Sequence, residues 1–425
     1  MSERVFRKDV LGNGLRVVTA EMPQAKSVAC FVMLAAGSRY ETRETNGIAH
    51  FAEHMFFKGT ENRPSAREIA GEIDSIGGEF NAFTGKEYTG YYVKCAAEHR
   101  DVALDVLIDM LRHSKFDPDE IEREKGVIVE EMNMYFDTPR DYLEGVYDEL
   151  LYGDQPLGWD IIGTKDTVRA ATRDTFLAYL DRWYRAPRIV AGVAGAVGDD
   201  ALARLEALLG DVQNGTTGQP DAVAWEQAEP RVKIHSKKSD QAHVRLGVHS
   251  YRLDHPDRYA LSVLATVLGG GMSSRLFSEV RERRGLAYYI YGYNQGYTDT
   301  GTLYAQGGVD INRIDEAVRT IIGEFGRIAS EPVSTDELEK ARNFAKGRLV
   351  LSLEDPRGLI LFGLRSEVLE GKTREPDDVI AGLDAVTMDD VQRVAADVIR
   401  EDRLNLAVIG PFDDPDRFEK LLAFS

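Results

Sequence analysis

Runs of apolar residues near the start of the chain predict β-strands. Residues 15–18 and 27–34 are such runs, and the dipeptide Asn13-Gly14 precedes them. Asn-Gly is typical of the tight turn that joins two antiparallel strands. Further along, residues 100–113 repeat their apolar positions with the 3.6-residue period of a helix. The first part of the chain therefore predicts a β-hairpin followed by a mixture of strands and helices.

The same order of elements recurs in the second half of the chain. The stretch 116–123, which begins a helix, has a counterpart at 333–340. A helix and strand at 172–195 have a counterpart at 387–410, displaced along the chain by nearly the same amount. Two landmarks at nearly one offset predict a duplicated domain, and the mixture of strands and helices places it in the α+β class.

A stretch rich in Gly, Thr, Gln and Pro separates the two copies. It covers residues 211–230 and has the composition of a linker. We therefore predict a first domain over residues 1–210 and a second, homologous domain over residues 231–425.

Composition narrows the function. The chain has 425 residues, 43% of them hydrophobic, which is enough to bury sizeable cores. Its formal charge of -19 and its pI near 5.0 argue against nucleic acid as a partner, because phosphate contacts need clustered Lys and Arg. The N-terminus lacks a signal-peptide core, and no apolar run reaches the roughly 18 residues of a membrane span. We expect a soluble, cytoplasmic protein with no membrane partner.

Residues 47–58 predict a short helix, with Asn46 as its N-cap and Gly59 as its stop. On this helix His50, His54 and Glu53 are spaced so that they share one face.

This spacing predicts a catalytic metal site. Two neutral imidazoles supply two of the three protein ligands that catalytic zinc needs, and the remaining position binds water. Glu53 can accept a proton from that water. A single histidine would more often be an ordinary surface or core residue, but the joint pattern H-x-x-E-H, formed by His50, Glu53 and His54, is the inverzincin signature.

The stretch around this motif, residues 47–60, resembles the pitrilysin/insulinase family of zinc peptidases, particularly bacterial relatives of the mitochondrial processing peptidase. The resemblance extends over nearly the whole chain, including its duplicated layout. It implies two homologous LuxS/MPP-like domains, each a mostly antiparallel sheet covered by helices. It also implies a metalloendopeptidase with a Zn²⁺ cofactor that hydrolyses peptides or unfolded polypeptide segments.

The third metal ligand is expected on the helix that begins at Asp117 and Pro118. We choose Glu131 as the ligand and Glu124, two turns earlier, as a group that orients the site. Glu130 stays open as the ligand on spacing alone, and Glu124 could instead form an ion pair with a nearby arginine. Helical angles place one set of residues on a common face, where unpaired carboxylates would be costly: Ile121, Glu124, Ile128, Glu131, Met132 and Tyr135.

Residues 80–84 predict an exposed strand edge to which an extended peptide could add through backbone hydrogen bonds. The matching stretch in the family is implicated in substrate binding, so the resemblance assigns that role to Asn81, Ala82 and Phe83. A simple hairpin turn is the alternative reading of these residues.

In the second half, the glycine-rich stretch 268–277 lacks the spacing of a phosphate-binding loop. The run that follows, residues 281–288, resembles the family's Arg/Tyr pair. The resemblance implies that Arg281 and Tyr288 hold the substrate carbonyl and stabilise the oxyanion formed during catalysis.

Only the first domain carries the H-x-x-E-H motif. The resemblance therefore implies a homodimer, in which a partner's second domain supplies Arg281 and Tyr288 to the zinc site. Two alternatives remain: a catalytic subunit that needs a different partner chain, and a non-catalytic scaffold, for which a broken motif would be expected.

Overall fold

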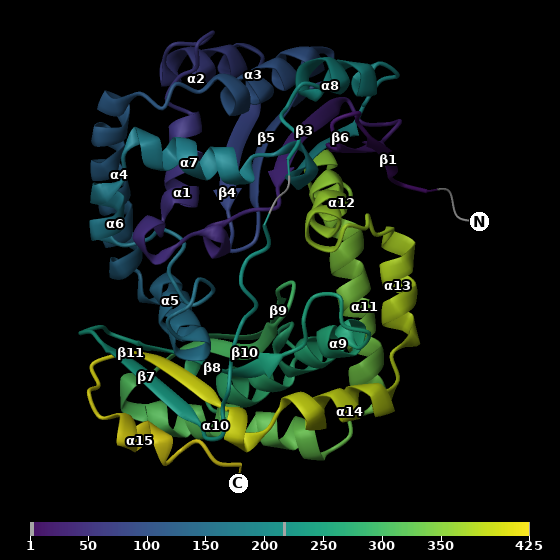
Figure 1. Ribbon diagram of the computed structural model, residues 1–425. Helices are drawn as coiled ribbons and strands as arrows, with labels where there is room; N and C mark the ends of the chain where they lie inside the picture. The colour runs from purple at the N-terminus through teal and green to yellow at the C-terminus, as the bar shows by residue number, and fades with distance from the viewer. Residues whose placement is uncertain (1–3, 216–217, 425) are drawn as a thin grey trace. The chain divides into compact units, whose positions relative to one another are not determined.

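We describe the protein from a computed structural model, shown as a ribbon in Figure 1. The structure describes residues 4–215 and 218–424. The first three residues, on which the signal-peptide prediction partly rested, and two residues of the predicted linker lie outside this part. The chain divides into two compact units. Unit 1 comprises residues 1–133, 159–221 and 350–378, and unit 2 comprises residues 134–158, 222–349 and 379–425.

A six-stranded sheet forms the centre of unit 1. Its order is β1-β2-β6-β3-β5-β4, and every neighbouring pair is antiparallel except β2 and β6. The strands are β1 (Arg7–Val10), β2 (Arg16–Glu21), β3 (Ser27–Leu34), β4 (Glu79–Thr84), β5 (Thr89–Ala96) and β6 (Ile189–Gly195).

Helices cover both faces of this sheet. They are α1 (Ile48–Phe56), α2 (Ala66–Ser75), α3 (Arg100–His113), most of α4 (Pro118–Asp137), α6 (Lys165–Ala170), α7 (Arg173–Trp183), α8 (Ala201–Leu209) and α12 (Pro356–Glu370). Side chains alternate along β3, so Val28, Cys30 and Val32 join the core with α1 and α3. Ala29 and Phe31 join the opposite core, against α12. β3 is therefore buried on both faces.

The hairpin predicted between residues 15–18 and 27–34 is wrong, although both strands form. The Asn13-Gly14 turn instead joins β1 to β2. β6, which comes much later in the chain than β3, lies between β2 and β3 in the sheet.

Unit 2 repeats this architecture around a five-stranded sheet of order β7-β11-β8-β10-β9, in which only the pair β7 and β11 is parallel. Its strands are β7 (Arg231–Ser236), β8 (Ala242–Ser250), β9 (Ala287–Gly296), β10 (Gly301–Val309) and β11 (Asn405–Gly410). Its helices are α5 (Pro139–Tyr152), α9 (Arg258–Gly269), α10 (Ile314–Ser330), most of α11 (Thr335–Ser352), α13 (Pro376–Ala385), α14 (Met388–Val398) and α15 (Pro415–Glu419). A π-helix, η5 (Phe277–Arg283), precedes β9. Short 3-10 turns complete the fold: η1 (Ser38–Tyr40), η2 (Arg43–Thr45), η3 (Ala97–His99), η4 (Ala186–Arg188), η6 (Ile311–Arg313) and η7 (Glu401–Arg403).

Each unit includes one helix that comes from the other half of the chain. α12, from the second half, packs against β3 and β6 of unit 1, and α5, from the first half, packs against β8 and β11 of unit 2 (Figure 1). The two mostly antiparallel sheets covered by helices confirm the predicted fold class. The boundaries at 1–210 and 231–425 stay a prediction about the duplication along the sequence, to which the structure adds this exchange of helices.

None of the helices in residues 4–215 and 218–424 combines the length and the apolar character that a membrane span requires.

Candidate metal centre

The helix that carries the H-x-x-E-H motif begins one residue later than predicted. Gly47, not Asn46, is the N-cap of α1, and it adopts a left-handed backbone with φ of 96°. A Cβ atom at Gly47 would lie 2.6 Å from the carbonyl oxygen of Ile162, so glycine is required there. Asn46 instead donates its side-chain amide to Glu41 and to a backbone carbonyl.

Glu41 holds the start of α1 in place. Its carboxylate accepts hydrogen bonds from the backbone N–H groups of Gly47, at 2.8 Å, and Ala49, at 2.7 Å. Burial raises the pKa of Glu41 to about 8, although these hydrogen bonds and that of Asn46 act to lower it. This carboxylate replaces the predicted Asn46 cap and satisfies donors that a helix N-terminus otherwise leaves free.

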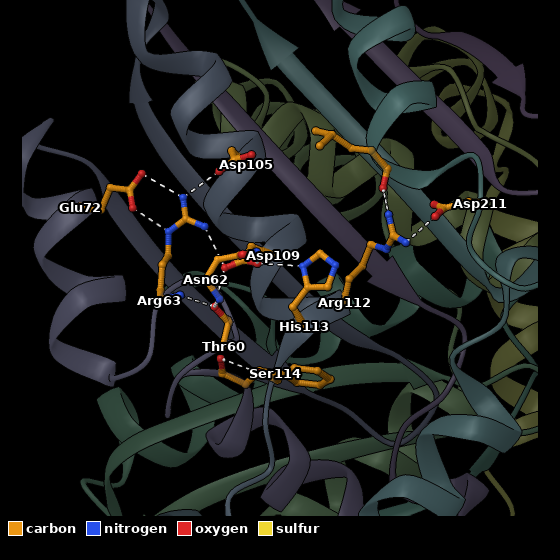
Figure 2. A network of polar contacts seen from close by, with 12 residues as sticks. Thr60, Asn62, Arg63, Glu72, Asp105, Asp109, Arg112, His113, Ser114 and Asp211 are labelled. Atoms are coloured by element: carbon orange, nitrogen blue, oxygen red, sulfur yellow. Dashed lines mark hydrogen bonds and ion pairs between the residues drawn. The ribbon is translucent and has the colours of Figure 1, made fainter.

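The segment after α1 is anchored to α3. Gly59, with φ of 125°, turns the chain where a Cβ atom would lie 2.5 Å from the carbonyl oxygen of Pro64. Figure 2 shows how Asp109 then accepts hydrogen bonds from Thr60, Asn62 and Arg63, at 2.6 to 2.8 Å. Arg63 also pairs with Glu72 and Asp105, and His113 bonds Asp109. Both ends of the motif helix are therefore fixed by buried or half-buried carboxylates.

His50, His54 and Glu131 come together at the surface where α1 faces α4. Each offers one ligand atom, and these atoms lie within 4.8 Å of one another. Nε2 of His50 lies 3.6 Å from Oε1 of Glu131, and Nε2 of His54 lies 3.4 Å from Oε2. Across the described part of the chain, this is the one group of three His, Cys, Asp or Glu side chains close enough to hold a metal ion.

The separations fit a tetrahedral metal. Zinc binds imidazole nitrogen and carboxylate oxygen at about 2.0–2.2 Å, so two ligand atoms on a tetrahedron lie about 3.4 Å apart. The nitrogen-to-oxygen distances of 3.4 and 3.6 Å match that spacing and are too long for hydrogen bonds. Two imidazoles and a carboxylate are also a donor set that suits zinc.

Glu131 and its neighbour Glu130 point in different directions. Glu130 is exposed, whereas Glu131 is half-buried and faces the histidines. The inward stripe predicted on α4 holds at Ile121, Glu124 and Ile128, which are buried, but it ends before Tyr135, whose side chain is 42% exposed.

Glu124 lies behind His54. Its Oε1 is 2.9 Å from Nδ1 of His54, and its Oε2 is 2.5 Å from Nζ of Lys58. Burial acts to raise the pKa of Glu124, but the hydrogen bonds to His54 and Lys58 outweigh it and leave the pKa below the usual value. Glu124 therefore contacts the histidine and also forms an ion pair, with a lysine in place of the expected arginine, and its role in orienting the site stays a prediction.

Glu53 lies on α1 beside His50, His54 and Glu131, which we call the metal group, and a strand of the neighbouring sheet holds its side chain. The hydroxyl of Thr84, at the end of β4, donates to Oε2 of Glu53 at 2.5 Å. Burial raises the pKa of the Glu53 carboxyl, and the hydrogen bond from Thr84 and the two histidines partly oppose this effect. Glu53 is thus oriented by the strand on which substrate was predicted to bind.

β4 is an edge strand, because among residues 4–215 and 218–424 the one strand that pairs with it is β5. Asn81 and Ala82 lie in its middle, and the side chain of Asn81 accepts a hydrogen bond from the backbone N–H of Ala82 at 2.8 Å. The ring of Phe83 packs against Tyr88 and across Gly90, so its main contacts are within unit 1. The strand edge is therefore available to backbone pairing.

Arg281 and Tyr288 belong to unit 2. Arg281 lies on the π-helix η5, and its guanidinium is 5.5 Å from the centre of the Tyr288 ring. Tyr288 is 75% exposed at the start of β9. The two side chains predicted to act as a pair are thus neighbours.

The chain belongs to the insulinase family of peptidases, family M16. The family described as Insulinase (Peptidase family M16) matches residues 16–165, and the Peptidase M16 inactive domain matches residues 170–344. The first match contains all the residues of the metal group, and the second contains Arg281 and Tyr288.

Relatives of similar length carry related descriptions. The chain is 40% identical over 399 residues to the uncharacterized zinc protease YmxG of Bacillus subtilis, covering 94% of this chain and 97% of that protein. It is 33% identical to an uncharacterized zinc protease of Rickettsia felis, covering 96% of this chain and 98% of the other. A protease structure from Helicobacter pylori shares the fold with a TM-score of 0.90 at 22% identity, covering 96% of this chain and all of that chain.

Sequence reasoning missed three side chains that support the site: Glu41, Lys58 and Thr84. Lys58 could have been found, because it follows His54 by one turn of the helix and therefore lies on the same helical face. Glu41 and Thr84 contact α1 from other segments, and local spacing carries no signal for such contacts.

Proposed function

We propose that the protein is a zinc-dependent metalloendopeptidase whose zinc is held by His50, His54 and Glu131. The observation that carries this proposal is that Nε2 of His50 and Nε2 of His54 lie 3.6 and 3.4 Å from the oxygens of Glu131, close to the separation of two ligands on tetrahedral zinc, with Glu53 beside them. The relatives described as zinc proteases support the same metal. When bound, zinc lowers the pKa of a water molecule and polarises the carbonyl of the peptide to be cleaved.

The side chains around the metal divide the remaining work. Glu53 accepts the proton of the attacking water and later delivers it to the leaving amine. Thr84 fixes the carboxylate of Glu53 for this task through its hydrogen bond. Glu124 accepts a hydrogen bond from Nδ1–H of His54, which leaves Nε2 free to bind the metal.

The substrate is proposed to be a peptide or an unfolded polypeptide segment. An extended chain can add to the free edge of β4 through backbone hydrogen bonds, which depend little on side-chain sequence. Because Thr84 joins β4 to Glu53, a peptide on this edge lies next to the catalytic base.

We also propose a homodimer in which the partner subunit's Arg281 and Tyr288 complete the site. The support is that the metal group lies in unit 1, whereas the Arg/Tyr pair lies in unit 2. The protein is diluted stepwise, and its sedimentation coefficient and its specific activity are measured at each concentration. Both should fall over the same range of concentration as the dimer dissociates. A monomer that keeps full activity would contradict the dimer and leave the metal assignment standing.

The proposed chemistry is tested by Glu53→Gln, with Glu130→Gln as a control. The control makes the same chemical change at an exposed glutamate on α4 and also tests the open alternative that Glu130 binds the metal. Wild type and both variants should hold about one zinc per chain. Hydrolysis of an unstructured peptide should fall by roughly 10²–10⁴-fold in Glu53→Gln alone. Unchanged hydrolysis by Glu53→Gln would refute the mechanism.

A further inference from the structure

The two oxygens of Glu124 are occupied by two residues from one segment of the chain. Oε1 lies 2.9 Å from Nδ1 of His54, and Oε2 lies 2.5 Å from Nζ of Lys58. The Glu124 side chain is only 6% exposed. A carboxylate buried to this extent needs a positive or hydrogen-bonding partner for each oxygen, and here each oxygen has one.

Backbone and side-chain contacts on both sides of Lys58 fix the position from which its side chain extends. Lys58 donates its backbone N–H to the carbonyl of Met55, directly after the end of α1. Gly59 then turns the chain, and Thr60 is fully buried with its hydroxyl on Asp109, the hub of the contacts in Figure 2. Lys58 is therefore presented from a fixed turn, one helical turn after the histidine that shares its partner.

Lys58 and His54 contact different oxygens of Glu124, so the lysine occupies the oxygen that the histidine does not. Glu131, another carboxylate of this site, lies close enough to Glu124 for the two like charges to repel each other. A carboxylate without the lysine would be free to rotate and turn its second oxygen toward a bound metal. With Oε2 bound to Lys58, Oε1 stays on Nδ1 of His54, and this contact fixes the orientation and the tautomer of that ring.

We propose that Lys58 is a positioning residue for the metal centre, which acts on His54 by holding Glu124 in one orientation. This inference rests on the proposed function, because it concerns the same metal ligands. Lys58, one helical turn after His54, thereby joins His54 and Glu124 as a third residue of this hydrogen-bonded group.

Whether the removal of Lys58 weakens or tightens zinc binding distinguishes a positioning role from simple charge repulsion. Lys58 is a cation near a cation-binding site, so removing it should by itself tighten zinc binding, because like charges repel. If Lys58 acts by positioning, its removal should weaken zinc binding instead, since partners that orient a metal ligand contribute about 10–100-fold to affinity.

The test measures the zinc dissociation constant of the metal-free protein by competition with a chelator. Lys58→Met should weaken binding by about tenfold or more, whereas Lys58→Arg should keep most of the affinity. Glu124→Gln should weaken binding as well, and the double variant Lys58→Met/Glu124→Gln should be no weaker than Glu124→Gln alone, because the lysine acts through the glutamate.

A matched control is Lys125→Met. Lys125 follows Glu124 on α4 and pairs with the exposed Glu122 at 2.6 Å, so the variant removes the same charge close by without touching His54. Its zinc affinity should equal that of the wild type. Circular dichroism and thermal melting should show that every variant is folded.

Unchanged or tighter zinc binding in Lys58→Met, or additive effects in the double variant, would overturn the role of Lys58. Such a result with a wild type that binds zinc and cleaves peptide leaves the proposed function intact. A wild type that binds no zinc would instead refute the proposed function itself.

Discussion

Units 1 and 2 share an arrangement of five strands, to which unit 1 adds β1, but they present different side chains from equivalent helices. In each unit a helix follows the central strand, α1 after β3 and α9 after β8. α1 carries His50, Glu53 and His54, whereas α9 has no charged residue after Arg258 and buries most of its length in the core.

The residue equivalent to Glu131, the proposed ligand, also differs. When α4 and α11 are aligned at their first residues, Glu131 corresponds to Arg348 and Glu124 corresponds to Ala341. An arginine cannot bind a metal in place of a carboxylate. The same fold therefore accommodates either set of side chains, and the proposed chemistry depends on a few positions in unit 1.

The largest loss of metal affinity and activity is expected when Glu131, which unit 2 lacks at the equivalent position, is replaced. Glu131→Gln should lose metal affinity by more than the roughly 10–100-fold expected of a residue that only orients a ligand, and peptide hydrolysis should disappear with it. Arg348→Gln, at the equivalent position in unit 2, should keep both. Metal content and hydrolysis measured side by side check this, and full metal binding by Glu131→Gln would contradict the assignment.

The histidines of the two units offer a second test. His249, on β8, is 3% exposed and stacks on Trp225 with ring centres 4.0 Å apart. Burial lowers the pKa of His249 to about 4, from about 6.5 in an unfolded chain. Between these pH values the unfolded state binds a proton that the folded state does not, so the free energy of unfolding falls as the pH falls. The loss should approach roughly 3 kcal/mol near pH 4.

His249→Phe should remove this part of the pH dependence, as measured by urea unfolding from pH 7 to pH 4. His255→Phe is a suitable control, because His255 also stacks on an aromatic ring but its side chain is 30% exposed. An unchanged pH dependence in His249→Phe would show that other groups are responsible.

The smallest effect is expected on the free energy of unfolding, from substitutions at the N-termini of α1 and α9. Glu41→Ala would leave the buried N–H groups of Gly47 and Ala49 without their acceptor, at a cost of about 2 kcal/mol of unfolding free energy. At α9 the N-cap Asp257 makes no capping hydrogen bond and instead pairs with Arg393, which is 54% exposed, so Asp257→Ala should cost less than about 1 kcal/mol. Chemical denaturation of both variants checks the order, and equal costs would contradict it.

Local spacing in the sequence was enough to bring the motif side chains together on one face of α1, while their catalytic and metal-binding roles stay a prediction. His50, Glu53 and His54 share a face because helical geometry is local, and the same geometry favoured Glu131 over Glu130. The start of α1 was misjudged, because an asparagine is an ordinary N-cap, whereas the actual cap depends on Glu41 and on the backbone of Gly47.

Long-range pairing accounts for the remaining errors. The wrong hairpin arose because β6, far away in the sequence, inserts between β2 and β3. The exchange of α5 and α12 likewise depends on which sheet each helix meets, and the apolar period of a helix does not encode that.

We propose that unit 1 binds zinc through His50, His54 and Glu131 and that unit 2 does not. Crystals grown with zinc and measured at its absorption edge test this most directly. We expect one strong anomalous peak per chain, about 2.0–2.2 Å from Nε2 of both histidines and from a carboxylate oxygen of Glu131. A chain without a peak at these atoms, or with its main peak in unit 2, would contradict it.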